Sequence, residues 1–201
     1  MKKILTGHKD SKKTLLPGFL IKIPRRLFFY SLLVIVLFVI IFYPYILILE
    51  IVPSLNNKAF LSIPVKKGDT FTIRFTHSVQ KTPVDETFSI GRNLKMVLEE
   101  TVYSSYGAGL PSEVNDNQEF LFENGKFIIR KFDMQFDEIP LFVGEVIANH
   151  TIIYNDKKFP LVSYKMAGKS VRIRLCNYSL ISYIRILLSQ KLMEENNGAK
   201  I

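Results

Sequence analysis

The sequence predicts an all-β extracytoplasmic domain, an antiparallel β-sandwich or barrel-like fold, with one N-terminal transmembrane helix and one C-terminal amphipathic helix. Three observations predict this class. A long uncharged apolar run lies near the N-terminus, and apolar residues alternate with polar ones from Ala59 onward. About nine such alternating runs, separated by turn residues, are typical of a sandwich or a barrel. A final stretch with helical spacing follows them.

The positive charge of the chain is concentrated before the apolar run. The 201 residues carry a formal net charge of +9, yet residues 1–26 alone hold eight basic side chains against one acid. The remainder is close to neutral, so the basic excess belongs to a cytoplasmic tail, residues 1–26. A nucleic-acid-binding domain would carry its basic residues on one face of the fold. The composition therefore argues against a nucleic-acid partner.

Residues 27–49 are apolar and uncharged, and we expect them to form a transmembrane helix. About 20 apolar residues in a helix cross the hydrocarbon layer of a bilayer. Pro44 removes one helical hydrogen bond, and Tyr43 and Tyr45 carry the amphipathic rings that favour a membrane interface. A cleaved signal peptide would have a shorter apolar region and a small-residue cleavage pattern, whereas EIVPSLNNK follows here. The sequence therefore favours an uncleaved signal anchor in a lipid bilayer.

The basic tail predicts the orientation of this anchor. Lysine and arginine are retained on the cytoplasmic side, so we expect a cytoplasmic N-terminus, a single pass and an extracytoplasmic main domain. The chain has one cysteine, Cys176, which excludes an internal disulfide and a cysteine-based metal motif. We expect no cofactor.

Residues 55–176 are expected to form the all-β domain. The run at residues 71–75 alternates apolar and polar side chains, which is typical of a half-buried strand. Asn124-Gly125 and Asn155-Asp156 each lie between two apolar runs and predict tight hairpin turns, because these residues tolerate positive φ. The run GKSVRIRL, residues 168–175, places its apolar side chains on one face of a strand and its two arginines on the other.

Residues 178–195 are expected to form the C-terminal amphipathic helix. Apolar residues recur there with helical spacing, and Arg185 and Ser189 lie four positions apart. The segment is too short and too often interrupted to span a bilayer. Two placements stay open: the helix packs against the sheet, or it lies on the membrane surface or on a partner.

The hairpin sequence FTIRFTHSVQKTPVDETFSI places two ionisable side chains on a face that should be apolar. His77 and Glu86 continue the apolar positions of their strands. We expect Phe75 to pair with Phe88, which brings His77 opposite Glu86 just inside the turn. A carboxylate beside an imidazole stabilises both charges, so the pair either fixes the turn or takes part in function. Ser78 points to the opposite face, which argues against a Ser-His-Glu nucleophilic arrangement.

The segment SSYGAGLPSE is expected to form a second unusual turn. Gly107 and Gly109 allow positive φ, and Pro111 stops a continuing strand. Successive amides in such a turn can form a concave anion site, although an ordinary wide turn uses the same residues. Tyr106 and Leu110 are candidates to line the mouth of a pocket.

The motifs THSVQKTPVDETFSI and YGAGLP together resemble the domain of unknown function 1850 family. The resemblance covers about residues 60–175. Members are small exported bacterial proteins, often encoded beside, or fused to, membrane subunits of TRAP transporters of the TAXI class. The family has no established activity, so the resemblance implies a bacterial cell membrane and a transporter context. The matching signature positions are His77, Ser78, Val79, Thr82, Pro83, Glu86, Gly107, Gly109, Leu110 and Pro111.

Two expectations of different class follow. The first is a non-catalytic accessory protein of a TRAP/TAXI-type secondary transporter, with the permease or the solute-binding protein as partner. The alternative is a membrane-tethered hydrolase or metal-dependent enzyme that uses His77 and Glu86, with Glu113 as a third metal ligand. The sequence contains no nucleophile elbow and no HExxH motif, which favours the first. The expected ligand- or partner-binding residues are His77, Ser78, Thr82, Glu86, Tyr106, Gly107, Gly109, Leu110 and Pro111.

Overall fold

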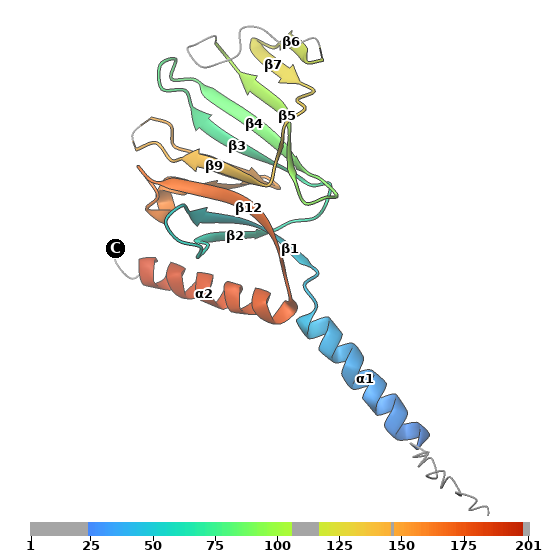
Figure 1. Ribbon diagram of the computed structural model, residues 1–201. Helices are drawn as coiled ribbons and strands as arrows, with labels where there is room; N and C mark the ends of the chain where they lie inside the picture. Colours follow the sequence, from blue (N-terminus) through green and yellow to red (C-terminus); the bar gives the residue numbers. More distant parts are fainter. Residues whose placement is uncertain (1–23, 106–116, 146, 199–201) are drawn as a thin grey trace, which may run out of the picture. The chain divides into compact units, whose positions relative to one another are not determined.

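The computed structural model describes residues 24–105, 117–145 and 147–198. The chain divides into two compact units, and the boundary in the sequence lies between Phe38 and Val39. The second unit contains the strands and the C-terminal helix (Figure 1).

The N-terminal helix α1 covers Arg25–Phe42, and its residues are not buried. Within the described ranges it is the helix that is long and apolar enough to cross a membrane. Its 18 residues extend about 27 Å, close to the thickness of a hydrocarbon layer. Such a helix fits a membrane anchor or a signal sequence.

Helix α1 is shorter than the expected span of residues 27–49. It ends at Phe42, and the strand β1 begins at Ile46, so the last part of the apolar run is paired in a sheet. Pro44 lies between them and has no amide hydrogen with which to continue the helix. The β-structure therefore begins at Ile46, before the expected boundary at residue 55.

The strands of the second unit follow the alternating runs of the sequence. They are β1 (Ile46–Pro53), β2 (Leu61–Pro64), β3 (Thr70–Thr76), β4 (Pro83–Ile90), β5 (Met96–Tyr103), β6 (Glu119–Glu123), β7 (Lys126–Arg130), β8 (Gln135–Phe136), β9 (Glu138–Phe142), β10 (Thr151–Tyr154), β11 (Lys157–Pro160) and β12 (Ser170–Tyr178). A short 3-10 helix, Leu161–Tyr164, follows β11.

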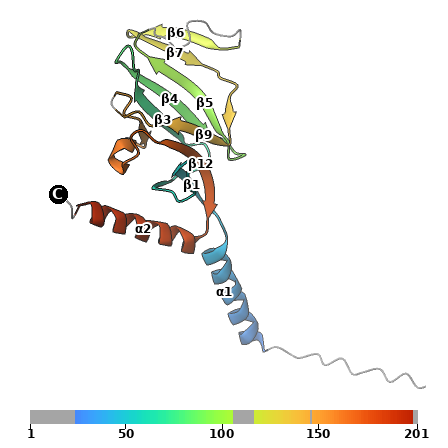
Figure 2. The ribbon, with the colours of Figure 1, turned by 60° about the vertical axis from the view of Figure 1, so that its left-hand side comes forward.

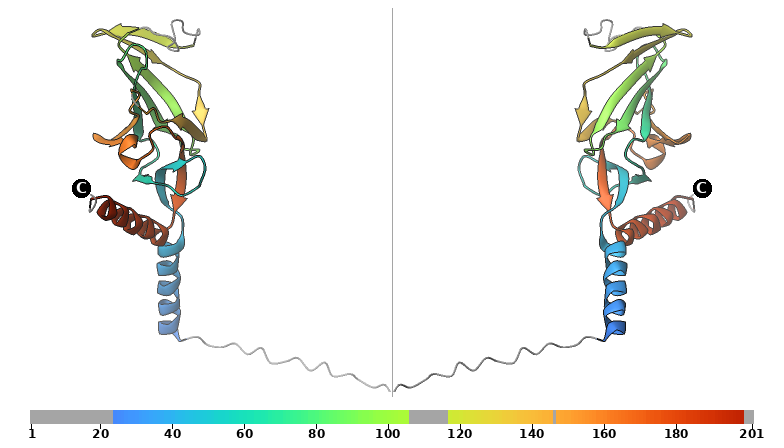
Figure 3. Two further views of the ribbon diagram at one scale, coloured as in Figure 1. Left: turned by 90° about the vertical axis from the view of Figure 1, so that its left-hand side faces the viewer. Right: turned by 90° about the vertical axis from the view of Figure 1, so that its right-hand side faces the viewer.

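The strands form two antiparallel sheets (Figures 1 and 2). The four-stranded sheet has the order β2-β1-β12-β9, and the eight-stranded sheet has the order β11-β10-β3-β4-β5-β7-β6 with β8 paired to β5. Strands β6 and β7 lie at the end of this unit that is opposite to helix α2 (Figure 3). The expected all-β antiparallel class is confirmed, and the described strands do not close into a barrel.

The main core lies between the two sheets. It combines Leu49 and Ile51 of β1 with Phe71 and Ile73 of β3 and Phe88 of β4. These side chains occupy every second position of their strands, as the alternating pattern predicts. The core is therefore of the sandwich type.

The two predicted hairpin turns are confirmed. Asn124 and Gly125 have φ angles of 52° and 73° and join β6 to β7. Asn155 and Asp156 have φ angles of 48° and 62° and join β10 to β11. Asn, Asp and Gly enter this left-handed region more readily than other residues, which is why the sequence located both turns.

The C-terminal helix α2 covers Leu180–Gly198, so it begins two residues later than the expected start at 178. Strand β12 continues to Tyr178 and delays the helix. The hydroxyl of Ser179 accepts a hydrogen bond from the amide of Ser182 at 3.4 Å, the geometry of a helix N-cap.

Candidate functional site

The β3–β4 hairpin has a different register from the expected one. Phe75 pairs with Val84, four positions before the expected partner, and Glu86 lies opposite Ile73. His77 and Glu86 do share a face of the sheet, but about 13 Å of strand separates their positions. The expected His77–Glu86 pair is therefore wrong.

The side chain of His77 explains this register because it closes the turn early. Its Nδ1 accepts hydrogen bonds from the amides of Val79 and Gln80 at 3.3 and 3.2 Å. Its own amide donates to the carbonyl of Thr82 at 2.9 Å, and Lys81 adopts a φ of 53°. With Nδ1 as acceptor, the imidazole carries its proton on Nε2. His77 is 8% exposed and acts as a fixed part of the turn.

Glu86 lies on the inner face of the eight-stranded sheet, between Ile73 of β3 and Thr101 of β5. Burial raises the pKa of the Glu86 carboxyl. Within the part of the chain that the structure describes, no hydrogen bond or ion pair reaches this carboxylate. An ionised carboxylate without a partner is unfavourable in such a place, and groups of this kind are concentrated at functional sites.

Aromatic side chains continue this inner face toward β6. Tyr103 is fully buried and forms a second small core with Val84 and Ile129. The ring of Phe127 stacks on Tyr103 with centroids 5.5 Å apart, and the ring of Phe122 lies 4.8 Å from Phe127. Phe122 is 63% exposed, so the apolar surface opens to solvent at β6. We call this surface the aromatic face; it comprises Phe75, Glu86, Thr101, Tyr103, Phe122 and Phe127.

His150 adds an imidazole at the edge of the aromatic face. It stacks on Phe75 with ring centroids 5.4 Å apart, and its Nδ1 accepts a hydrogen bond from the amide of Gly144 at 3.3 Å. Burial lowers the pKa of His150, which favours the neutral ring. The sequence alone does not indicate this position for His150, because only the pairing of β10 with β3 brings it beside the hairpin.

The tip of the hairpin meets the end of β5. The hydroxyl oxygens of Thr82 and Ser105 lie 3.3 Å apart, so Thr82 is next to the start of the glycine segment. Ser78 lies in the turn and is exposed. Tyr106, Gly107, Gly109, Leu110 and Pro111 lie outside the described residues, and the anion site stays a prediction.

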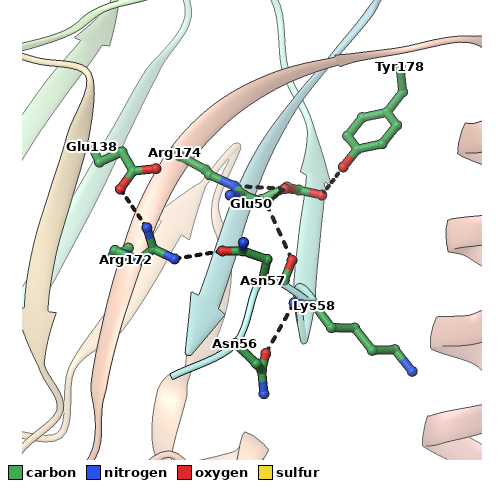
Figure 4. Close-up of polar contacts among 8 residues, drawn as sticks. All are labelled: Glu50, Asn56, Asn57, Lys58, Glu138, Arg172, Arg174 and Tyr178. Carbon is green, nitrogen blue, oxygen red and sulfur yellow. Dashed lines mark hydrogen bonds and ion pairs between the residues drawn. The ribbon is translucent and has the colours of Figure 1, made fainter. Parts of the chain in front are cut away.

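A second polar cluster lies on the outer face of the four-stranded sheet (Figure 4). We call it the Glu50 cluster; it comprises Glu50, Glu138, Arg172, Arg174 and Tyr178. Glu50 is 2% exposed and accepts two hydrogen bonds from Arg174, both at 3.1 Å, and one from the Tyr178 hydroxyl at 2.6 Å. Beside them Arg172 pairs with Glu138 at 3.0 Å. Burial, and then the hydrogen bond to Glu50, raises the pKa of Tyr178.

The alternating pattern of the sequence predicts part of this cluster. It places Arg172 and Arg174 together on one face of a strand, and the structure confirms that placement. The pattern does not predict Glu50, because this residue directly follows the apolar run and is 124 positions from Arg174.

The aromatic face has the properties of a binding surface. It combines an exposed ring, buried apolar side chains and a carboxylate that has no partner among the described residues, the mixture typical of sites that orient a ligand or a partner segment. In the described ranges, no group of three His, Cys, Asp or Glu side chains is placed to hold a metal ion. A partner would offer an apolar group to Phe122 and a cation or a hydrogen-bond donor to Glu86.

Comparison with known proteins bears on the same region of the chain. No curated protein and no solved structure matches the sequence. A family model, described as Domain of unknown function (DUF1850), matches residues 71–161. This range includes Glu86, Phe122 and His150 and leaves out helices α1 and α2, Glu50, Arg174 and Tyr178. Through residues 71–161, the chain belongs to the DUF1850 family.

Proposed function

We propose that this protein is a membrane-anchored extracytoplasmic accessory protein of a TRAP/TAXI-type secondary transporter, and that it acts by binding through the aromatic face. The family resemblance supplies the transporter context, and the basic tail supplies the orientation. The observation that carries the binding role is the half-buried Glu86 carboxylate, which no described residue pairs with, beside rings that open to solvent at Phe122.

The solute-binding protein of the transporter is the partner that we favour over the permease. Strands β6 and β7 carry the exposed part of the aromatic face and lie at the far end of the domain from the start of β1 (Figure 3). The start of β1 follows the apolar helix directly in the chain. A soluble extracytoplasmic partner can reach the far end, and burial of Phe122 would contribute about 1–2 kcal/mol. A cation or donor at Glu86 would add a charge-assisted hydrogen bond.

The alternative function, a hydrolase or metal-dependent enzyme, requires His77 and Glu86 to act on one substrate. The register separates the two residues, and two backbone amides occupy Nδ1 of His77. We therefore favour binding over catalysis by this pair.

The test is solute uptake in cells that keep the transporter and lack this protein. Complementation with the wild-type chain should restore uptake, and Phe122→Ser should lose about half or more of the restored rate. Phe142→Ser is the matched control, because Phe142 is 60% exposed on β9 in the other sheet. Membrane levels of the variants are compared by immunoblot.

Two results would contradict the proposal. Full uptake without the protein removes the accessory role. Equal uptake with Phe122→Ser and Phe142→Ser removes the aromatic face as the contact surface.

A further inference from the structure

Helix α2 leaves a group of three apolar side chains exposed to solvent. Ile184, Leu187 and Leu188 are 47%, 44% and 58% exposed. Arg185, Ile186, Ser189 and Gln190 line a groove of about 280 Å³ between the helix and the four-stranded sheet. A helix that only covered a sheet would bury its large apolar side chains against that sheet.

Helical geometry places these three apolar side chains together. Positions 184, 187 and 188 lie within about one turn of each other on the same side, because side chains three and four apart are neighbours. Ile186 and Ser189 fall on the other side of the helix and line the groove. No other described segment covers Leu188.

The Glu50 cluster fixes the place where α2 begins. Tyr178 is the last residue of β12, and its hydroxyl donates to Glu50 at 2.6 Å (Figure 4). Ser179 then caps the helix through the amide of Ser182. The side of α2 that carries Ile186 and Ser189 thus faces Glu50 across the groove, which Tyr178 also lines.

The register of the four-stranded sheet fixes where α2 begins. Tyr178 pairs with Ile46, the first residue of β1. Ile46 follows Phe42, the last residue of α1, by four positions, and an extended chain covers about 14 Å over that distance. Helix α2 therefore starts at the end of the domain where the chain leaves the apolar helix.

We propose that α2 lies on the outer surface of the bilayer that α1 spans, with Ile184, Leu187 and Leu188 inserted at the boundary between headgroups and acyl chains. This inference rests on the anchor assignment of the proposed function. Arg185 lies three positions before Leu188 and Lys191 three positions after it, so both basic side chains border the exposed apolar group, and interfacial helices pair basic residues with such a face. The domain would then be held at the membrane at two points, the anchor and α2.

The absence of tryptophan from the sequence gives a direct test. Single-tryptophan variants of the full chain are reconstituted in phosphatidylcholine vesicles, with and without bromine on the acyl chains. Leu188→Trp reports on α2, and Leu33→Trp reports on the anchor. Phe142→Trp is the control, because Phe142 pairs with Ser170 at the other end of β12 from α2.

We expect brominated lipid to lower the fluorescence of Leu188→Trp and Leu33→Trp at least about two-fold and to leave Phe142→Trp unchanged. Unquenched Leu188→Trp with quenched Leu33→Trp would overturn the membrane placement of α2 and keep the anchor. Unquenched Leu33→Trp would overturn the anchor, and the placement of α2 with it. If the fluorescence of Leu188→Trp is the same with and without brominated lipid but changes with protein concentration, a second copy of the chain covers this part of α2. That result would also overturn the proposal.

Discussion

Glu50 and Glu86 are two carboxylates in opposite situations. Glu50 is 2% exposed, and its oxygens accept hydrogen bonds from Arg174 and Tyr178. Glu86 is less deeply buried, yet no described residue bonds to it, and burial raises the pKa of its carboxyl. The same fold therefore supplies hydrogen-bond donors to one buried carboxylate and none of its described donors to the other. We infer that Glu50 serves the structure and that Glu86 is kept for a partner.

The largest effect is expected for Glu50→Leu. Removal of this carboxylate leaves Arg174 half-buried without its partner, so the free energy of unfolding should fall by about 3 kcal/mol or more. The double variant Glu50→Leu/Arg174→Leu should lose less than the sum of the single variants. The measurement is thermal unfolding of the full chain in detergent, followed by circular dichroism.

The matched control for that experiment is the ion pair of Arg130 and Glu100, which is more exposed. Glu100→Leu should cost about 1 kcal/mol or less, because exposed ion pairs contribute little. Equal losses for Glu50→Leu and Glu100→Leu would contradict a structural role for the Glu50 cluster.

A smaller effect is expected for Tyr178→Phe. This change keeps the ring and removes the hydroxyl that donates to Glu50, so it should lower the free energy of unfolding by about 1–2 kcal/mol. The same thermal scan measures it. An unchanged melting temperature would mean that a water molecule replaces the hydroxyl and that solvent reaches Glu50 more easily than its burial indicates.

The opposite sign is expected for Glu86→Gln. The folded-state pKa of Glu86 is raised above the ordinary 4.5, so its contribution to stability is present below that pH and is lost as the pH rises through the folded pKa. Glu86→Gln should therefore raise the melting temperature at neutral pH, by up to about 4 °C, and should have no effect at pH 4. Melting curves across this range check both points, and a lower melting temperature at neutral pH would point to a hidden partner.

The smallest effect is expected for His150. Its folded-state pKa is lowered below 6.5, so its contribution to stability is present above that pH and is lost as the pH falls through the folded pKa. His150→Phe retains a ring beside Phe75 and should weaken the loss of stability between pH 6.5 and 5, by about 1 kcal/mol or less. Identical acid melting curves for the variant and the wild type would show that the ring does not titrate in this range.

Local patterns in the sequence predicted most of the fold. Alternation located the strands around Phe71 and Ile173, and Asn124-Gly125 and Asn155-Asp156 located two turns. The residue at which α1 ends could not be predicted from such a pattern. A buried strand and a membrane helix are both apolar without a break, so β1 was hidden in the run that continues from α1.

The site was harder to predict because its contacts are long-range or depend on one side chain. The register of the hairpin is set by Nδ1 of His77, which the alternating pattern does not encode. Phe122 and His150 reach the aromatic face only through the pairing of β6 with β7 and of β10 with β3. The face on which Glu86 lies was predicted correctly by alternation alone.

The central claim is that Glu86 is retained for binding at the expense of stability, and one variant tests it directly. Glu86→Gln is introduced into the full chain, and its melting temperature and its restoration of solute uptake are measured at neutral pH and equal membrane level. We predict that the variant melts at or above the wild-type temperature and restores less than about half of the wild-type uptake. Full uptake together with unchanged or higher stability would contradict the claim and would leave Glu86 without a role in binding.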